Sequence, residues 1–137
     1  LEEENKKGLS TNKPYDDFRD RIYEFKLKIR QLLDKLHKEK SLIIGYGAST
    51  KGNVLLQFAG ITSRDIPYIG EVNEDKFGSY TPGTLIPIIS EEKAREMNPD
   101  YFFVFPWHFK DFILNKEKLN KDRKVSLLFP LPSIEII

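Results

Sequence analysis

The stretch Ser41-Leu-Ile-Ile-Gly-Tyr-Gly-Ala-Ser-Thr-Lys-Gly-Asn53 decides the fold of this chain. Its apolar start, residues 41–44, is typical of a parallel strand that is covered on both faces. The glycines that follow permit a tight turn. Ser49 and Thr50 both suit the N-cap of a helix whose buried face lies in residues 54–58. Because free backbone N–H groups at a helix start attract anions, the stretch predicts a ligand that carries phosphate.

The composition excludes several classes of protein. A length of 137 residues suits one domain with an appendage, and a net charge of +1 gives no general attraction to nucleic acid or membranes. The absence of cysteine excludes disulfides and thiolate metal sites, and two histidines are too few for a histidine-rich site. No apolar run is long enough to span a bilayer, and no signal peptide is visible. We therefore expect a cytoplasmic protein without nucleic-acid or membrane partners.

The first forty residues predict an appendage to the domain. Residues 1–13 are polar and are interpreted as a linker or a frayed end, and residues 14–40 as a connector helix. An apolar stripe runs along one face of this helix. It packs on the domain or on a missing neighbour. Alternatively, because its members are on average about 3.5 residues apart, it forms a coiled-coil dimer. Its members, which lie on one face of the helix, are Phe18, Ile22, Phe25, Ile29, Leu32 and Leu36.

Apolar segments alternate with helix signals through residues 41–137. Short apolar runs bounded by turn residues predict strands, Gly60 suits a helix end, and Ser90 before two glutamates predicts the start of a short helix. This alternation is typical of an α/β domain with an open, mainly parallel sheet and helices on both faces. The segments expected to be extended are residues 41–44, 66–70, 85–89, 101–105, 125–129 and, as a last edge strand, 134–137.

Three strand ends carry unusual residues, and we expect them to converge on one crevice. In an open α/β sheet, ligands sit outside the carboxyl ends of the strands. These ends are the glycine turn Gly45–Asn53, the segment Glu71–Gly78 and the segment Pro106–His108. Since the three segments are far apart in the chain, their convergence is the main physical indication of a ligand site.

The glycine turn follows neither standard nucleotide fingerprint. Gly45-Tyr-Gly47 begins like the dinucleotide pattern, but Thr50 stands where the third glycine belongs. Lys51 precedes Gly52, whereas the P-loop lysine follows its glycine. The turn is therefore either a ligand grip or only a tight connection. Lys51 is in the same way either a point charge for a phosphate or a solvated helix lysine.

Residues of the other two segments suit a nucleotide ligand. Glu71 lies where dinucleotide folds place the acid that binds ribose, and Asn73 is placed to orient it. Trp107 can stack on a base or a sugar, and His108 can bind a phosphate or act as an acid or base. Each also has an ordinary structural interpretation, such as a loop acid or a cover for the sheet edge. No catalytic set is evident, so no catalytic residue is assigned.

Several of these motifs together resemble the C-terminal domain of the sugar C-methyltransferases. The resemblance covers residues 41–132, and its motifs occur in the family's order. Enzymes of that family transfer a methyl group from S-adenosylmethionine to a carbon of a nucleotide-linked keto-sugar. The resemblance implies a Rossmann-like domain that a long helix precedes. The motifs are Gly45–Asn53, Asn73–Gly78, Thr81–Ile88, Pro99–Tyr101 and Phe105–His108.

The family's architecture implies what this chain contains. It combines a cysteine-rich zinc region, a central domain for S-adenosylmethionine, and a C-terminal domain that helps to hold the nucleotide sugar. We therefore expect this chain to bind a nucleotide-diphosphate sugar, to bind no cofactor itself and to be inactive alone. S-adenosylmethionine, zinc and the catalytic base are expected in N-terminal domains of the same polypeptide. The residues assigned to the substrate are Gly45, Tyr46, Gly47, Ala48, Ser49, Thr50, Lys51, Gly52, Asn53, Glu71, Asn73, Lys76, Pro106, Trp107 and His108.

Two other functions stay open on the residues alone. The Gly-x-Gly turn with Glu71 also suits a domain that binds NAD or coenzyme A, as part of an oxidoreductase or a ligase. The apolar stripe within residues 18–36 also suits an interaction module, which dimerises or docks through its N-terminal helix.

Overall fold

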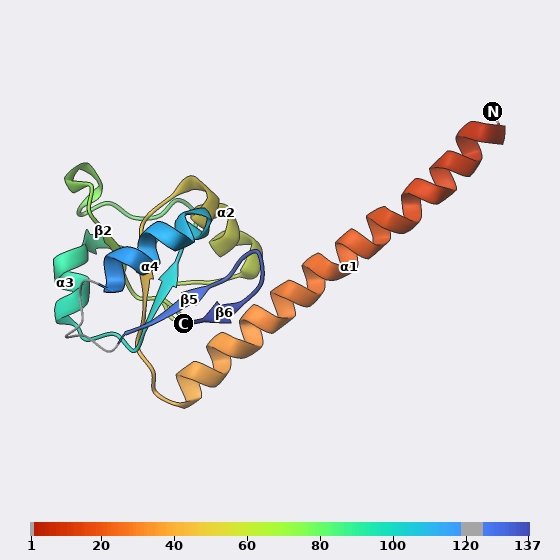
Figure 1. Cartoon of the computed structure of the whole chain (residues 1–137). Helices are drawn as coiled ribbons and strands as arrows, with labels where there is room; N and C mark the ends of the chain where they lie inside the picture. Colours follow the sequence, from red (N-terminus) through yellow and green to blue (C-terminus); the bar gives the residue numbers. More distant parts are fainter. Residues whose placement is uncertain (1, 119–124) are drawn as a thin grey trace.

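A six-stranded sheet forms the centre of the fold (Figure 1). The computed structural model describes residues 2–118 and 125–137, with side chains from Asp16 onward in the first helix. The strand order is β3-β2-β1-β4-β5-β6, and all neighbours are parallel except the last pair, β5 and β6. This confirms the predicted α/β class and the mainly parallel sheet. The strands are Ile43–Tyr46, Ile69–Glu71, Ile88–Ser90, Tyr101–Val104, Ser126–Phe129 and Glu135–Ile136.

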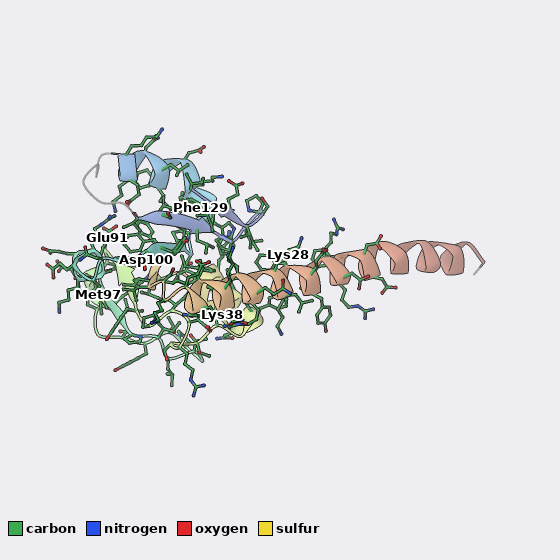
Figure 2. The ribbon with its side chains drawn as sticks, turned by 90° about the horizontal axis from the view of Figure 1, so that it is seen from below. Lys28, Lys38, Glu91, Met97, Asp100 and Phe129 are labelled. Carbon is green, nitrogen blue, oxygen red and sulfur yellow. The ribbon has the colours of Figure 1, made fainter. Side chains whose placement is uncertain are left out.

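Helices cover both faces of this sheet. Alternate residues of a strand point to opposite faces, so Ile43 and Phe103 pack in a core with α1 and α2, whereas Ile44 and Phe102 pack in a core with α3 and α4. Figure 2 shows α4 and α1 on opposite sides of the sheet. The helices are α1 (Glu2–Lys38), α2 (Thr50–Ala59), α3 (Glu91–Glu96) and α4 (Lys110–Lys118), with short 3-10 turns at Glu74–Lys76 and Trp107–Phe109.

The helix ends form where the turn chemistry predicts them. The Ser49 Oγ atom accepts a hydrogen bond of 3.0 Å from the backbone N–H of Gly52 and so caps α2. Gly60 closes that helix in the left-handed conformation, with a φ of 66°. Ser90 caps α3 in the same way, by accepting from the N–H of Lys93 at 3.1 Å.

Strand β1 begins later than predicted. The N–H of Ser41 still donates to the Leu36 carbonyl at the end of α1, and the N–H of Leu42 donates to the Asp100 carboxylate. The strand therefore starts at Ile43 and includes Gly45. A Cβ atom on Gly45 would lie 2.5 Å from the Phe105 ring and 2.7 Å from Ile69. This glycine thus permits close packing beneath the turn rather than contact with a ligand.

Helix α1 is attached to the domain only through its second half. Ile29, Leu33 and Leu36 are buried in the core, whereas Phe18 near the start of the described side chains is exposed. In Figure 2, Lys38 lies within the outline of the domain, and the helix continues outward beyond Lys28. The helix also includes residues 2–13, which the sequence suggested as a linker or frayed end. The division of the chain into domains stays a prediction.

An ion pair ties the buried half of α1 to the loop after α2. The Arg30 guanidinium donates to both carboxylate oxygens of Asp65, which is itself buried. Burial alone raises the pKa of Asp65, but hydrogen bonds from Arg30 and from the Thr62 backbone outweigh it and hold that pKa below its ordinary value. The connector helix is therefore fixed by charge as well as by its apolar stripe.

Candidate functional site

The three unusual strand ends meet at the carboxyl edge of the sheet. β1 and β4 are neighbours, and α2 leaves β1 on one face while α4 follows β4 on the other. This is the topological switch point at which open α/β sheets bind ligands. The Gly47 N–H donates to the Gly70 carbonyl at 2.8 Å, and the Lys76 ammonium donates to the Ala48 carbonyl at 3.0 Å. The side chains of these segments nevertheless face three separate hollows.

The first hollow, here the α2 hollow, lies beside the start of α2 and has a volume of about 210 Å³. Its floor and walls are largely apolar, and its polar groups come from the glycine turn and from Lys76. Such a space can bind a flat apolar ring and an anion that is attached to it. Its lining residues are Ala48, Ser49, Thr50, Gly52, Asn53, Leu56, Ile69, Lys76, Thr81, Pro82, Ile88 and Phe105.

Two features of the α2 hollow suit a polar ligand. The first N–H groups of α2, at Thr50 and Lys51, have no carbonyl four residues back within the helix to bind. The Asn53 Oδ1 atom is buried and has no hydrogen-bond partner within the part of the chain that the structure describes. A buried acceptor without a partner is costly, so a ligand that donates to Asn53 offsets that cost.

Loop contacts hold the far wall of the α2 hollow in place. The Gln57 amide of α2 donates to the Pro82 carbonyl at 2.9 Å. Thr81 is buried, and its hydroxyl accepts from the N–H of Ile86 at 2.8 Å. Gly83 adopts a φ of +78°, a left-handed conformation that favours glycine. Thr81 and Pro82, which belong to the motif Thr81–Ile88 of the resemblance, therefore form a wall of this hollow.

Glu71 and Asn73 are already engaged in shaping the loop after β2. The Glu71 carboxylate accepts from the backbone N–H groups of Val72 at 2.7 Å and Asn73 at 3.3 Å, and from Lys76 at 3.3 Å. The Asn73 side chain accepts from the N–H of Asp75 at 3.1 Å and caps the following turn. Since a carboxylate has about four acceptor positions, Glu71 keeps room for one more donor.

The second hollow, here the α4 hollow, lies on the opposite face of the sheet and has a volume of about 260 Å³. It shares Ala48 with the α2 hollow, so the glycine turn separates the two. Its polar groups are chiefly acidic, and aromatic side chains of α4 and the turn before it form its rim. Its lining residues are Tyr46, Gly47, Ala48, Gly70, Glu71, Val72, Glu91, Pro106, Phe109, Phe112, Ile113 and Lys116.

A cluster of charges forms one side of the α4 hollow. The Arg95 guanidinium, only 10% exposed, binds Glu117 through both of its terminal nitrogens and Glu91 at 3.0 Å. The Lys116 ammonium lies 3.1 Å from each carboxylate oxygen of Glu91. Burial alone raises the pKa of Glu91, but Lys116 and Arg95 outweigh it, and the net shift is downward. Glu91 is therefore ionised at neutral pH.

Tyr46 places a phenol beside this cluster. It is 8% exposed, and burial, together with the nearby charge of Glu91, raises its pKa despite the opposing effect of Lys116. The phenol stays protonated at neutral pH for that reason. The protonated phenol keeps a hydrogen that it can donate.

The third hollow, here the α1 groove, is the largest, at about 620 Å³. Lys51 and Trp107, which the sequence assigned to the substrate, line this groove between α1 and α2 instead of the two hollows beside the glycine turn. His108 lines none of the three; it is exposed, and its ring centroid lies 4.3 Å from that of Phe109. The groove is lined by Phe18, Arg21, Ile22, Phe25, Lys51, Val54, Leu55, Phe58, Trp107, Leu131 and Pro132.

Several residues of the α4 hollow, among them Glu91, Phe112 and Lys116, were not assigned to the site from the sequence. Glu91 was interpreted only as one of two glutamates at the start of a short helix, and Phe112 and Lys116 were given no role at a site. Their helical spacing could have indicated that they lie together. Four residues follow the i, i+3, i+4, i+7 pattern of one helix face, namely Phe109, Phe112, Ile113 and Lys116. That face starts directly after a strand end, where it reaches the sheet edge.

No metal or membrane feature accompanies these hollows. Among the described residues, no group of three or more acidic, histidine or cysteine side chains is placed to hold a metal ion. Of the helices in residues 2–118 and 125–137, none is both long and apolar enough to cross a membrane.

Comparisons with known proteins identify relatives of the chain. A family model described as "C-methyltransferase C-terminal domain" matches residues 1–132. The C-methyltransferase NovU of Streptomyces niveus is 31% identical over 137 residues, which are all of this chain and 33% of that protein. The chain thus spans about a third of the length of this curated relative.

Proposed function

Because the chain belongs to the C-methyltransferase family, as its C-terminal domain, we propose that it holds the substrate of a methyltransferase that uses S-adenosylmethionine. The substrate class is a nucleotide-linked keto-sugar. The methyl donor and the groups that move protons lie outside this domain. The chain by itself therefore binds without transferring methyl groups.

The observation that carries this proposal is the composition of the α2 hollow. It combines the free N–H groups at the start of α2 with the Lys76 ammonium, which suits a diphosphate. It also offers apolar walls and the unpaired Asn53 oxygen, which suit a base. A nucleotide diphosphate meets both requirements at once.

Isothermal titration of the chain with nucleoside diphosphates and their sugar esters tests the proposal. We expect binding with dissociation constants below about 1 mM, which corresponds to about −4 kcal/mol. Lys76→Gln should weaken it about tenfold, because a hydrogen bond to a charged group contributes about 1.5–3 kcal/mol. Lys51→Gln makes the same chemical change at a lysine that lines the α1 groove, and it shows whether that lysine also reaches the phosphates. Saturable micromolar binding of NAD or coenzyme A instead, or no heat from a folded chain at millimolar ligand, would overturn the proposal.

We also propose a docking role for the α1 groove, because its lining is almost wholly apolar and exposes Phe18 and Phe58. Exposed apolar surface of this extent marks interaction sites. The occupant that we assign is the remainder of a C-methyltransferase polypeptide, since this chain spans only 33% of its relative. Arg21 and Lys51 at the groove add two positive charges that an acidic segment can meet.

Sedimentation tests the docking role. The chain alone should sediment as a monomer and should form a complex with the part of NovU outside the matched third. Phe58→Asp should abolish that complex, and Phe112→Asp, on the opposite face, should not. A dimer of the chain alone that Phe58→Asp dissociates would assign the groove to a second copy instead.

A further inference from the structure

We propose that the α4 hollow is the subsite for the sugar ring of the nucleotide sugar. This inference rests on the proposed function and adds where the neutral part of the ligand lies. The α4 hollow shares Ala48 with the α2 hollow and lies on the other side of the glycine turn. A diphosphate held at the start of α2 therefore has its sugar directed across the turn.

The charges of the α4 hollow favour a neutral ligand over a phosphate. Glu71 and Glu91 both line it, and Lys116 is the single cation among its lining residues. That ammonium is already bound to both carboxylate oxygens of Glu91, and Arg95 pairs with Glu91 and Glu117. An anion entering this space would meet carboxylates without a free counter-charge.

The polar atoms of the α4 hollow suit hydroxyl groups. The Tyr46 phenol has a hydrogen to donate, and the carboxylates of Glu71 and Glu91 each keep an acceptor position. A sugar hydroxyl both donates and accepts, so it can bind a phenol on one side and a carboxylate on the other. A carboxylate that accepts from a hydroxyl forms one of the stronger hydrogen bonds.

The rim of the hollow suits the apolar face of a sugar ring. Phe109 and Phe112 lie on it and are 57% and 70% exposed, and Val72 across the opening is exposed as well. Aromatic rings left open at a hollow lose water-exposed area when a ring with C–H groups covers them.

Titration with matched pairs of ligands tests this inference in the whole chain. The pairs are UDP and UDP-glucose, dTDP and dTDP-glucose, and ADP and ADP-glucose. For the base that binds, we expect the sugar ester to bind about tenfold more tightly than the diphosphate, as one or two well-placed hydrogen bonds would give. Tyr46→Phe and Phe112→Ala should each remove most of that preference and leave the affinity for the diphosphate unchanged.

Controls separate this inference from the proposed function. Tyr23→Phe and Phe18→Ala make the same chemical changes on exposed side chains of α1 and should preserve the preference. If the diphosphate binds but the sugar adds nothing, or if Tyr46→Phe and Phe112→Ala leave the preference intact, the sugar subsite is wrong and the nucleotide site stands. If a folded chain binds neither ligand of any pair, the proposed function fails, and the subsite fails with it.

Discussion

The α2 hollow and the α4 hollow share one glycine turn and one sheet edge, yet they differ in charge. The α2 hollow offers backbone N–H groups, Lys76 and apolar walls, whereas the α4 hollow offers two carboxylates, a buried phenol and an aromatic rim. The difference follows from strand geometry, because neighbouring residues of β1 point to opposite faces. Gly45 lets Phe105 and Ile69 pack closely on the α2 side, and Tyr46 places its ring on the α4 side.

This difference shows how one short turn can serve two parts of one ligand. The turn is compact at Gly47, where a side chain is disfavoured for two reasons. Gly47 adopts a φ of +78°, and a Cβ atom there would lie 3.0 Å from the Pro106 ring. In our proposal, an anion binds on one side of it and a neutral polyol on the other. Variants on the two sides of the turn should therefore differ in their effects.

The largest expected effect comes from Phe105→Ala. Phe105 is 1% exposed and packs beneath the turn against Gly45 and Gly52, so its removal leaves a cavity under the α2 hollow. We expect a loss of about 3–5 kcal/mol in the free energy of unfolding, measured by urea denaturation. The comparison variant, Phe112→Ala at the rim of the α4 hollow, should change it by less than about 0.5 kcal/mol. Equal losses would show that the two sides do not differ in packing as described.

Arg95→Met should have the next largest effect, and it acts on the α4 side. It leaves Glu91 and Glu117 partly buried with one cation fewer. We expect a loss of about 3 kcal/mol, the lower end for breaking a buried pair, because Lys116 still meets Glu91. Arg19→Met removes an exposed pair with Asp16 and should cost at most about 1 kcal/mol. Similar costs for the two arginines in urea denaturation would contradict the role given to burial.

Acid should weaken the charge cluster of the α4 side in a defined pH range. The pKa of Glu91 is lower in the folded chain than its ordinary value of 4.5, so the unfolded chain binds more protons there. The stabilisation by Glu91 is complete above pH 4.5 and is lost as the pH falls through the lower, folded value. Thermal unfolding between pH 3 and 7 should therefore be less pH-dependent for Glu91→Gln than for the wild type.

A control variant and a second titrating group must be considered with that pH profile. Glu92→Gln removes the same charge from an exposed neighbour and serves as the control for Glu91→Gln. Asp65, which pairs with Arg30 on the α1 side, also has a lowered pKa, from an ordinary value of 3.8, so its contribution is lost only as the pH falls below that ordinary value. A profile for Glu91→Gln that matches the wild type would show that the cluster does not contribute.

The smallest expected effect distinguishes the two sides through their helix caps. Ser49→Ala and Ser90→Ala each remove a cap and should each cost about 1 kcal/mol in urea denaturation. Only Ser49→Ala should also weaken the binding of a nucleoside diphosphate, because only α2 starts at the α2 hollow. Equal effects of the two caps on binding would remove the distinction between the sides.

Local chemistry made much of the fold predictable. The caps at Ser49 and Ser90, the left-handed Gly60 and the apolar strand Tyr101–Val104 lie where the residue patterns predicted them. The start of β1 was less predictable, because it depends on Asp100, which is distant in sequence and binds the N–H of Leu42. Short-range patterns do not include such a contact.

The candidate site was less predictable than the fold. The sequence indicated which segments meet at the sheet edge but not which face each side chain takes. Lys51 and Lys76 were both assigned to the substrate, yet one lines the α1 groove and the other the α2 hollow. Glu71 looked free for a ribose, whereas it accepts from its own loop and from Lys76. Strand alternation and tertiary hydrogen bonds decide these placements, and neither is visible in a motif.

The most direct test of the division between the two hollows is an NMR titration of the isotope-labelled chain. A nucleoside diphosphate should shift the backbone amide signals of Thr50 and Gly52 and leave the ring signals of Tyr46 and Phe112 in place. The corresponding glucose ester should shift both sets at the same ligand concentration. Shifts of the two rings by the diphosphate alone, or a sugar ester that shifts only the amides of the α2 hollow, would contradict the account.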